Sequence, residues 1–236
     1  STVSAPSGGM AGENDWLRVL MDEALERDEQ PLWRPPVDSF RGSGSGNPCV
    51  RALTFEALGP CVPFEARVLR IFATGKAIEL VIVEAARKAK VLVEKSDQLA
   101  GVVVGEHGKP HITCHVDMIA ARPTDGQRFL IEIKSINEHQ FDNLPKEHGP
   151  TLAKKSPLFE KYRNYVVQWN TYAFTPEVDL NEGCLLFEAK NSQKQKYYWL
   201  RRDQDLFEET VARHVEAAEY AVYSEPRQLA PIPEGF

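Results

Sequence analysis

Cysteine is scarce in this sequence, and the few cysteines are scattered. The chain of 236 residues holds four, with no C-x-x-C pair among them: Cys49, Cys61, Cys114 and Cys184. Disulfide-stapled folds and cysteine-based zinc sites need clustered cysteines, so the pattern favours free thiols in a reducing compartment. We expect neither a disulfide framework nor a zinc site.

Long apolar runs are also missing. No stretch approaches the roughly 20 apolar residues that a membrane helix needs. The first residues lack the charged and apolar segments of a secretory signal. The composition, with 42% hydrophobic and 26% charged residues, is that of an ordinary globular protein long enough to bury a core. We therefore expect a cytoplasmic protein with no membrane partner.

Positive charge is not in excess, because the formal net charge is -6. This at first argues against a nucleic-acid partner. However, residues 11–30 alone carry a net charge of -5, so the remaining chain is near neutral and is compatible with a basic groove. Basic runs usually form solvated surface, and they would track phosphates only if they converge. These runs are Arg41 and Arg51; Lys154, Lys155, Lys161 and Arg163; and Lys190, Lys194 and Lys196.

Turn residues and apolar periodicity divide the chain into three parts. Residues 1–41 hold an acidic amphipathic helix over 14–29 and a proline-rich connector, and residues 224–236 form a proline-rich extended tail. Residues 42–223 are expected to form one α/β domain, with a mixed central β-sheet flanked by helices.

The elements expected within this domain alternate between helices and strands. The first is a helix that begins at Pro48 after the cap Asn47 and closes at Gly59, and the second is a long helix over 64–89, interrupted at Gly75 and buried against the sheet. Strands follow over 91–95, 98–106, 111–118 and 128–135, with turns at 106–110 and 122–127, and then a polar loop over 136–157. The last elements are a helix over 158–174, strands over 183–189 and 196–201, and a helix over 203–223.

The strand over 128–135 places unlike side chains on its two faces. Phe129, Ile131 and Ile133 point to one face, while Glu132 and Lys134 project side by side from the other. Taken alone, such a pair is more often a solvated ion pair on an exposed sheet face.

The strand over 111–118 gives the pair a third partner. Asp117 lies on its polar face, 14 residues before Glu132, which leaves room for a turn and a return strand. Two neighbouring strands would then bring Asp117, Glu132 and Lys134 to one point. Two converging carboxylates suit a hard cation such as Mg²⁺, and a lysine beside it can position a water and stabilise charge developing on a phosphate.

These residues carry a resemblance to a known family. Asp117, followed by Glu132-Ile133-Lys134, resembles the PD-(D/E)xK nuclease motif, and Gln168-Trp169-Asn170-Thr171-Tyr172 resembles the Q-x-x-x-Y motif of the RecB-like, phage-type exonuclease branch. Gly44 to Arg51 is similar to the serine-rich, Cys-x-Arg segment that precedes the core in phage-encoded and CRISPR-adaptation relatives. The resemblance covers roughly residues 42–201.

The resemblance implies a restriction-endonuclease-like core and Mg²⁺- or Mn²⁺-dependent cleavage of DNA, at ends or in single strands, during recombination, repair or phage DNA metabolism. It implies Asp117, Glu132 and the Ile133 carbonyl as metal ligands, with Lys134 as the catalytic lysine. Glu79 would be a further metal ligand, or alternatively ordinary helix surface. DNA contacts are implied for Gln168, Tyr172, Arg51 and Ser45, and for the first two the alternative is that they hold Lys134 in place.

The sequence departs from the family in its cysteines. Several relatives carry an iron-sulfur cluster, held by one cysteine near the position of Cys49 and by three near the C-terminus, but only Cys184 lies downstream here. A cluster is therefore not expected. The implied setting is the cytoplasm of a bacterial or phage-infected cell.

Two other functions stay open at this stage. A non-catalytic module of the same fold would bind DNA or a protein partner, and the acidic helix over 14–29 would suit such a partner. An endonuclease of the same superfamily would use the same residues.

Overall fold

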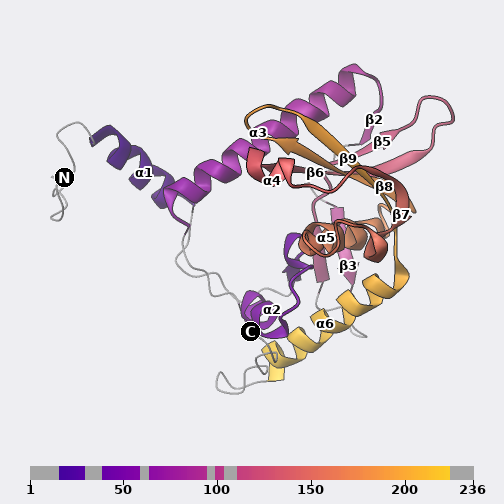
Figure 1. Cartoon of the computed structure of the whole chain (residues 1–236). Coiled ribbons are helices and arrows are strands. Elements are labelled where there is room, and N and C mark those ends of the chain that lie inside the picture. The colour runs from indigo at the N-terminus through magenta and orange to yellow at the C-terminus, as the bar shows by residue number, and fades with distance from the viewer. Residues whose placement is uncertain (1–15, 30–38, 59–63, 95–98, 104–110, 224–236) are drawn as a thin grey trace.

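The computed structural model describes residues 16–29, 39–58, 64–94, 99–103 and 111–223 (Figure 1). Some of the expected elements lie outside these ranges: the connector over 30–38, the turn at 106–110 and the tail over 224–236 are not described.

Six strands form the main sheet, in the order β2-β5-β6-β8-β9-β7. The β6–β8 and β7–β9 pairs are parallel, and the other neighbours are antiparallel, so the expectation of a mixed sheet is confirmed. The strands are β2 (Leu92–Glu94), β5 (Met118–Ala121), β6 (Arg128–Ile136), β7 (His148–Leu152), β8 (Glu182–Ala189) and β9 (Gln195–Arg201).

Three short strands form a second sheet, in the order β1-β4-β3. They are β1 (Ser39–Arg41), β3 (Leu99–Val103) and β4 (His111–Cys114). β1 pairs in parallel with β4, and Phe40 at its centre is fully buried. A strand from the end of the predicted connector therefore takes part in the core.

Helices cover both faces of the main sheet, as expected for an α/β domain. α3 (Ala66–Lys88) crosses one face, and α5 (Arg163–Ala173) lies between the other face and α6 (Gln204–Tyr223), with α2 (Val50–Leu58) packed on α6 (Figure 1). The short helix α4 (Glu138–Asp142) lies beside β8, and the 3₁₀ turns η1 (Gly42–Gly44) and η2 (Ala153–Lys155) both contact α5. None of the helices in the described ranges has both the length and the apolarity of a membrane-spanning helix.

The predicted alternation along β6 is confirmed by the two cores. Phe129, Ile131 and Ile133 join the smaller core beneath α3, whereas Leu130 belongs to the larger core on the α5 side. The Trp169 indole N–H of α5 donates to the Leu130 carbonyl at 3.2 Å, which fixes α5 against this strand.

The prediction of a single strand over residues 111–118 is wrong. The segment forms two strands in different sheets, β4 ending at Cys114 and β5 beginning at Met118. Asp117 lies in the break between them. The apolar residues alternate through the break, but Ile112, Cys114 and Val116 join the larger core whereas Met118 joins the smaller one.

The prediction of a polar loop over residues 136–157 is also wrong, because this segment contains α4, β7 and η2. Asn137 caps α4 by accepting from the Gln140 N–H at 2.8 Å. The edge strand β7 pairs with β9 although much of it is exposed. An edge strand with one partner and little burial carries few apolar residues, which explains why its sequence reads as a loop.

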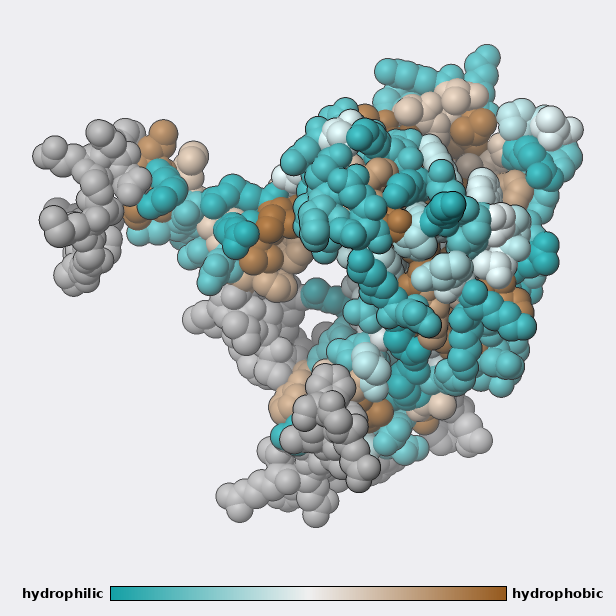
Figure 2. All heavy atoms as spheres, in the orientation of Figure 1, coloured by the Kyte–Doolittle hydropathy of each residue, from teal (hydrophilic) through white to brown (hydrophobic). Residues whose placement is uncertain are grey.

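The long helix differs from expectation in two ways. α3 runs without interruption through Gly75, and its buried residues lie mainly in its second half. Figure 2 shows apolar atoms on the surface where α1 (Trp16–Glu29) lies beside the first half of α3. The exposed apolar side chains there and further along α3 are Leu17, Leu20, Met21, Phe64, Ile71, Phe72, Leu80 and Val81.

Two other helix starts shift inward. α2 begins at Val50 rather than Pro48, although Asn47 does accept from the Cys49 N–H at 3.0 Å. α5 begins at Arg163 rather than residue 158, because residues 158–162 form turns. The turn over 122–127, the strand pair β8–β9 and the last helix agree with expectation to within about one residue.

Candidate functional site

Glu132 and Lys134 project from β6 toward α5, as the alternation predicts. The Glu132 side chain is 2% exposed, and the Lys134 ammonium donates to its Oε1 atom at 2.7 Å. The pair of Glu132 and Lys134 is therefore not a solvated ion pair on an open sheet face. The pair is enclosed beneath α5.

Gln168 of α5 closes a network around this pair. Its Oε1 atom accepts from the Lys134 ammonium at 2.9 Å, and its Nε2 atom donates to Glu132 Oε1 at 2.7 Å and to the Tyr172 hydroxyl at 3.0 Å. Residues four apart lie on one face of a helix, which is why Gln168 and Tyr172 reach the same point. Both side chains are buried. This is the arrangement expected if they hold Lys134 in place.

Asp117 reaches the same strand from the break before β5. Its Oδ2 atom accepts from the Ile133 backbone N–H at 2.7 Å. Ile133 lies between Glu132 and Lys134, so this bond places the Asp117 carboxylate beside the pair. The break between β4 and β5 thus places Asp117 beside Glu132 and Lys134. We expected a continuous strand to bring it there.

Burial and crowding change the acidity of these groups. Desolvation raises the pKa of Asp117 well above its usual range, and the neighbouring Glu132 carboxylate raises it further. Desolvation also raises the pKa of Glu132, against the lowering effect of Lys134. Burial lowers the pKa of Lys134, but the two carboxylates outweigh it and the pKa is raised. The buried Glu132 and the partly buried Asp117 thus lie near one ammonium, and the site is short of positive charge.

Glu79 lies on α3, near enough to this site for its charge to act on both acids. Its two carboxylate oxygens accept hydrogen bonds from the Lys76 ammonium, at 2.9 Å for Oε1 and 3.1 Å for Oε2. Its side chain is 14% exposed. Its negative charge raises the pKa of both Asp117 and Glu132. Within the described ranges, no three His, Cys, Asp or Glu side chains lie close enough together to hold one metal ion.

The donor set at Asp117 and Glu132 nevertheless fits a hard cation. The Glu132 Oε2 atom is buried and has no hydrogen-bond partner in the described part of the chain. A buried carboxylate oxygen without a partner is costly. A divalent cation would supply both a ligand for that oxygen and the missing positive charge.

The remaining predicted DNA contacts lie elsewhere. Ser45 is fully buried, and its hydroxyl donates to the Gly42 carbonyl at 2.7 Å. It lies against α5, where the Thr171 hydroxyl approaches its Oγ atom at 3.5 Å. Arg51 is on α2 with its guanidinium over the Phe55 ring at 5.9 Å, and none of its contacts reaches the Glu132 network. The structure brings together Asp117, Glu132, Lys134, Gln168 and Tyr172, but not Arg51.

One side chain at the site did not follow from sequence reasoning. The Tyr165 ring of α5 lies 5.1 Å from the Lys134 ammonium, at a distance typical of a cation–π contact. Its position three residues before Gln168, on the same helix face, is the pattern that could have identified it.

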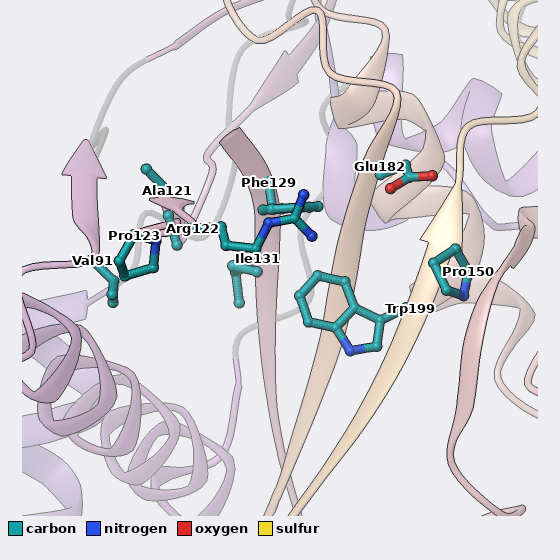
Figure 3. Close-up of a pocket in the computed structure, with 10 residues that line it drawn as sticks. Val91, Ala121, Arg122, Pro123, Phe129, Ile131, Pro150, Glu182 and Trp199 are labelled. Carbon is teal, nitrogen blue, oxygen red and sulfur yellow. The ribbon is translucent and has the colours of Figure 1, made fainter. Parts of the chain in front are cut away.

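A separate hollow lies on the opposite face of the main sheet (Figure 3). It has a volume of about 490 Å³ and is lined by Phe129 and Ile131 of β6, Trp199 of β9 and the Arg122 turn, among others. Phe129 and Ile131 belong to the face of β6 that points away from Glu132 and Lys134. This hollow is therefore not part of the carboxylate site.

No protein-family model and no curated protein matches the chain. Among solved structures, the crystal structure of SSO0001 is similar at a TM-score of 0.50, with 12% sequence identity over 91% of this chain and 98% of that chain. An identity this low shows a shared fold alone. The mixed α/β arrangement described above is thus one that a solved structure also adopts over nearly its whole length.

Proposed function

We propose that this protein is a metal-dependent DNA nuclease, of exonuclease type, that hydrolyses phosphodiester bonds at DNA ends or in single strands. The observation that carries the proposal is the convergence of Asp117, Glu132 and Lys134 beneath α5, with two desolvated acids and one ammonium. The restriction-endonuclease-like topology is part of the same proposal. It is supported by the mixed sheet and by the place of this site on adjacent strands.

The roles of the chain's own residues follow from their contacts. Asp117 and Glu132 would hold Mg²⁺ or Mn²⁺, with the Ile133 carbonyl as a third ligand. When bound, the metal would polarise the phosphodiester and lower the pKa of an attacking water. Lys134, held by Glu132 and Gln168, places a fixed positive charge where negative charge would develop on the phosphate.

The first test is release of nucleotides from linear DNA. We expect Mg²⁺-dependent release by the wild-type protein and a loss of at least about a hundredfold in Asp117→Ala and Lys134→Ala, because removing one electrostatic contributor commonly costs that much. Asp125→Asn and Lys88→Ala change an exposed acid and an exposed lysine and should retain wild-type activity. Equal activity in all five proteins would mean a contaminating nuclease and would sink the assignment.

Metal binding can be tested without turnover. We expect Mg²⁺ or Mn²⁺ to raise the melting temperature of the wild-type protein, by mass action on the folded state. Asp117→Asn keeps an acceptor for the Ile133 N–H but removes one of two crowded charges. This variant should melt higher than wild type without metal and should gain little when metal is added. A metal-induced gain equal to that of wild type would remove Asp117 from the ligand set.

Two further experiments separate the alternatives. Cleavage of closed circular DNA would support an endonuclease of the same superfamily. Tight DNA binding with no cleavage under any divalent metal would favour the non-catalytic module. The acidic helix α1 does not by itself favour that module, since Glu26 accepts from the Ala66 N–H at 2.8 Å and Asp22 pairs with Arg70, both within the chain.

A further inference from the structure

Two arginines meet where α5, α6 and the end of the glycine-rich segment 42–46 come together. Arg163 is the first residue of α5, and Arg213 lies on α6, which packs against α5. The two side chains are close enough for the charge of Arg163 to contribute to lowering the pKa of Arg213, after the larger effect of burial. Two like charges are thus held near each other in a partly buried place.

Each of these two guanidinium groups has one unsatisfied donor. The Nε atoms of both are buried and have no acceptor in the part of the chain that the structure describes. Arg213 uses its Nη2 atom for two long bonds of 3.3 Å, to the Ser45 carbonyl and the Thr210 hydroxyl. Arg163 lies over the Phe159 ring at 4.8 Å. Buried charged donors without acceptors are costly, and native structures rarely keep them without a reason.

The neighbouring charges do not balance the pair. Glu209 is the carboxylate beside them, and both arginines contribute to lowering its pKa, after its hydrogen bond with Lys154. Glu209 is therefore already engaged by the Lys154 ammonium. Three cationic side chains surround one acid, although the whole protein is acidic.

We propose that Arg163 and Arg213 form a binding site for a phosphate group of DNA, distinct from the Glu132–Lys134 site. The inference rests on the proposed function for its ligand. A guanidinium presents a rigid fork of N–H donors that matches phosphate oxygens, and a phosphate supplies both the acceptors and the negative charge that are lacking here.

The site is tested first with inorganic phosphate alone. We expect phosphate to raise the melting temperature of the wild-type protein and of Arg67→Gln, which changes an exposed arginine on α3. The double variant Arg163→Gln/Arg213→Gln should show no such rise. In phosphate-free buffer its melting temperature should stay close to that of wild type, because the repulsion that is removed offsets the lost contacts to Ser45, Thr210 and Phe159. An equal phosphate effect in the double variant, or a large loss of stability without phosphate, overturns the proposal.

The second test uses DNA under conditions without cleavage, by fluorescence anisotropy in Ca²⁺. We expect the double variant to bind a short oligonucleotide about tenfold more weakly. The slope of log affinity against log salt should fall by about one, as for one lost phosphate contact. A loss confined to 5′-phosphorylated oligonucleotides assigns the site to a terminal phosphate, and an equal loss with 5′-hydroxyl oligonucleotides assigns it to an internal phosphodiester. No loss with either overturns it.

The two proposals fail separately. If the wild-type protein cleaves no DNA but the double variant still loses phosphate and DNA binding, the nuclease assignment falls and the anion site stands. If cleavage depends on Lys134 but the double variant binds phosphate and DNA like wild type, the anion site alone falls.

Discussion

The hydrogen bonds of Gln168 distinguish positioning from DNA contact. Its side chain is buried and both of its polar atoms are used, one by Lys134 and the other by Glu132 and Tyr172. A buried amide with three partners has little capacity left for a ligand. We therefore treat Gln168 as a positioning residue that keeps the ammonium and the carboxylate apart from solvent and fixed relative to each other.

Replacing Gln168 by methionine tests this role, since the side chains are similar in length. We expect kcat to fall by about 10–100-fold, the effect typical of residues that orient a metal site. KM should change little, because both polar atoms of the buried glutamine are already used within the protein. Steady-state cleavage of a labelled oligonucleotide measures both. Gln204→Met, at an exposed position of α6, is the matched control. A rise in KM at constant kcat would instead identify a DNA contact.

At the scale of elements, the close pairing of β6 with β8 in the middle of the sheet fixes the position of the strand that carries Glu132 and Lys134. Gly183 of β8 is paired with Leu130 of β6, two residues before Glu132. A Cβ atom at Gly183 would collide with the Leu130 carbonyl and approach its nitrogen at 3.0 Å. The close approach of the two backbones therefore requires glycine at this position.

Gly183→Ala should accordingly open this end of the β6–β8 pair. We expect a loss of about 1–3 kcal/mol in the free energy of unfolding, the usual cost of overpacking. Chemical denaturation measures it. Gly149→Ala on β7 is the control, because a Cβ there meets no atom within 4 Å. Equal midpoints for both variants would contradict the close approach.

Local pattern predicted the site better than it predicted the sheets. The side-chain faces of β6 follow from its alternation alone, and the spacing of Gln168 and Tyr172 follows from helix geometry. The break at Asp117 could not be predicted in this way, because alternation depends on which face is buried and not on which sheet buries it. The edge strand β7 could not be predicted either, because its pairing with β9 is set by tertiary contacts rather than by its own residues.

For the molecule as a whole, β1 and α6, which are far apart in the sequence, meet at His214. This residue of α6 is fully buried, and its ring packs edge-on against Phe40 of β1 at 4.8 Å between centroids. Its Nδ1–H donates to the Thr210 carbonyl at 2.7 Å, while Nε2 has no partner among the described residues. Burial lowers its pKa to about 4, an effect that the Thr210 carbonyl opposes and the Arg213 charge reinforces. The imidazole is therefore neutral in the folded protein at neutral pH.

This neutral histidine sets an acid limit on the stability of the whole fold. In the unfolded chain a histidine takes up a proton near its ordinary pKa of about 6.5, whereas the folded protein resists protonation until about pH 4. The unfolded state thus binds more protons between these values, and stability falls as the pH drops through that window. A difference of about 2.5 pKa units corresponds to about 3 kcal/mol, lost progressively between about pH 6.5 and about pH 4.

The prediction is tested by chemical denaturation of wild type and His214→Gln at several values between about pH 7 and about pH 4.5. The substitution removes the titrating group, so the stability of wild type relative to the variant should decrease toward acid, by about 2 kcal/mol or more at the lowest value. His139→Gln, which changes an exposed histidine of α4, should follow wild type throughout. Acids such as Asp117, whose pKa is raised, shift stability in the opposite direction, but they are common to all three proteins and cancel in the comparison. A difference between wild type and His214→Gln that stays constant with pH would show that His214 does not set the acid limit of the fold.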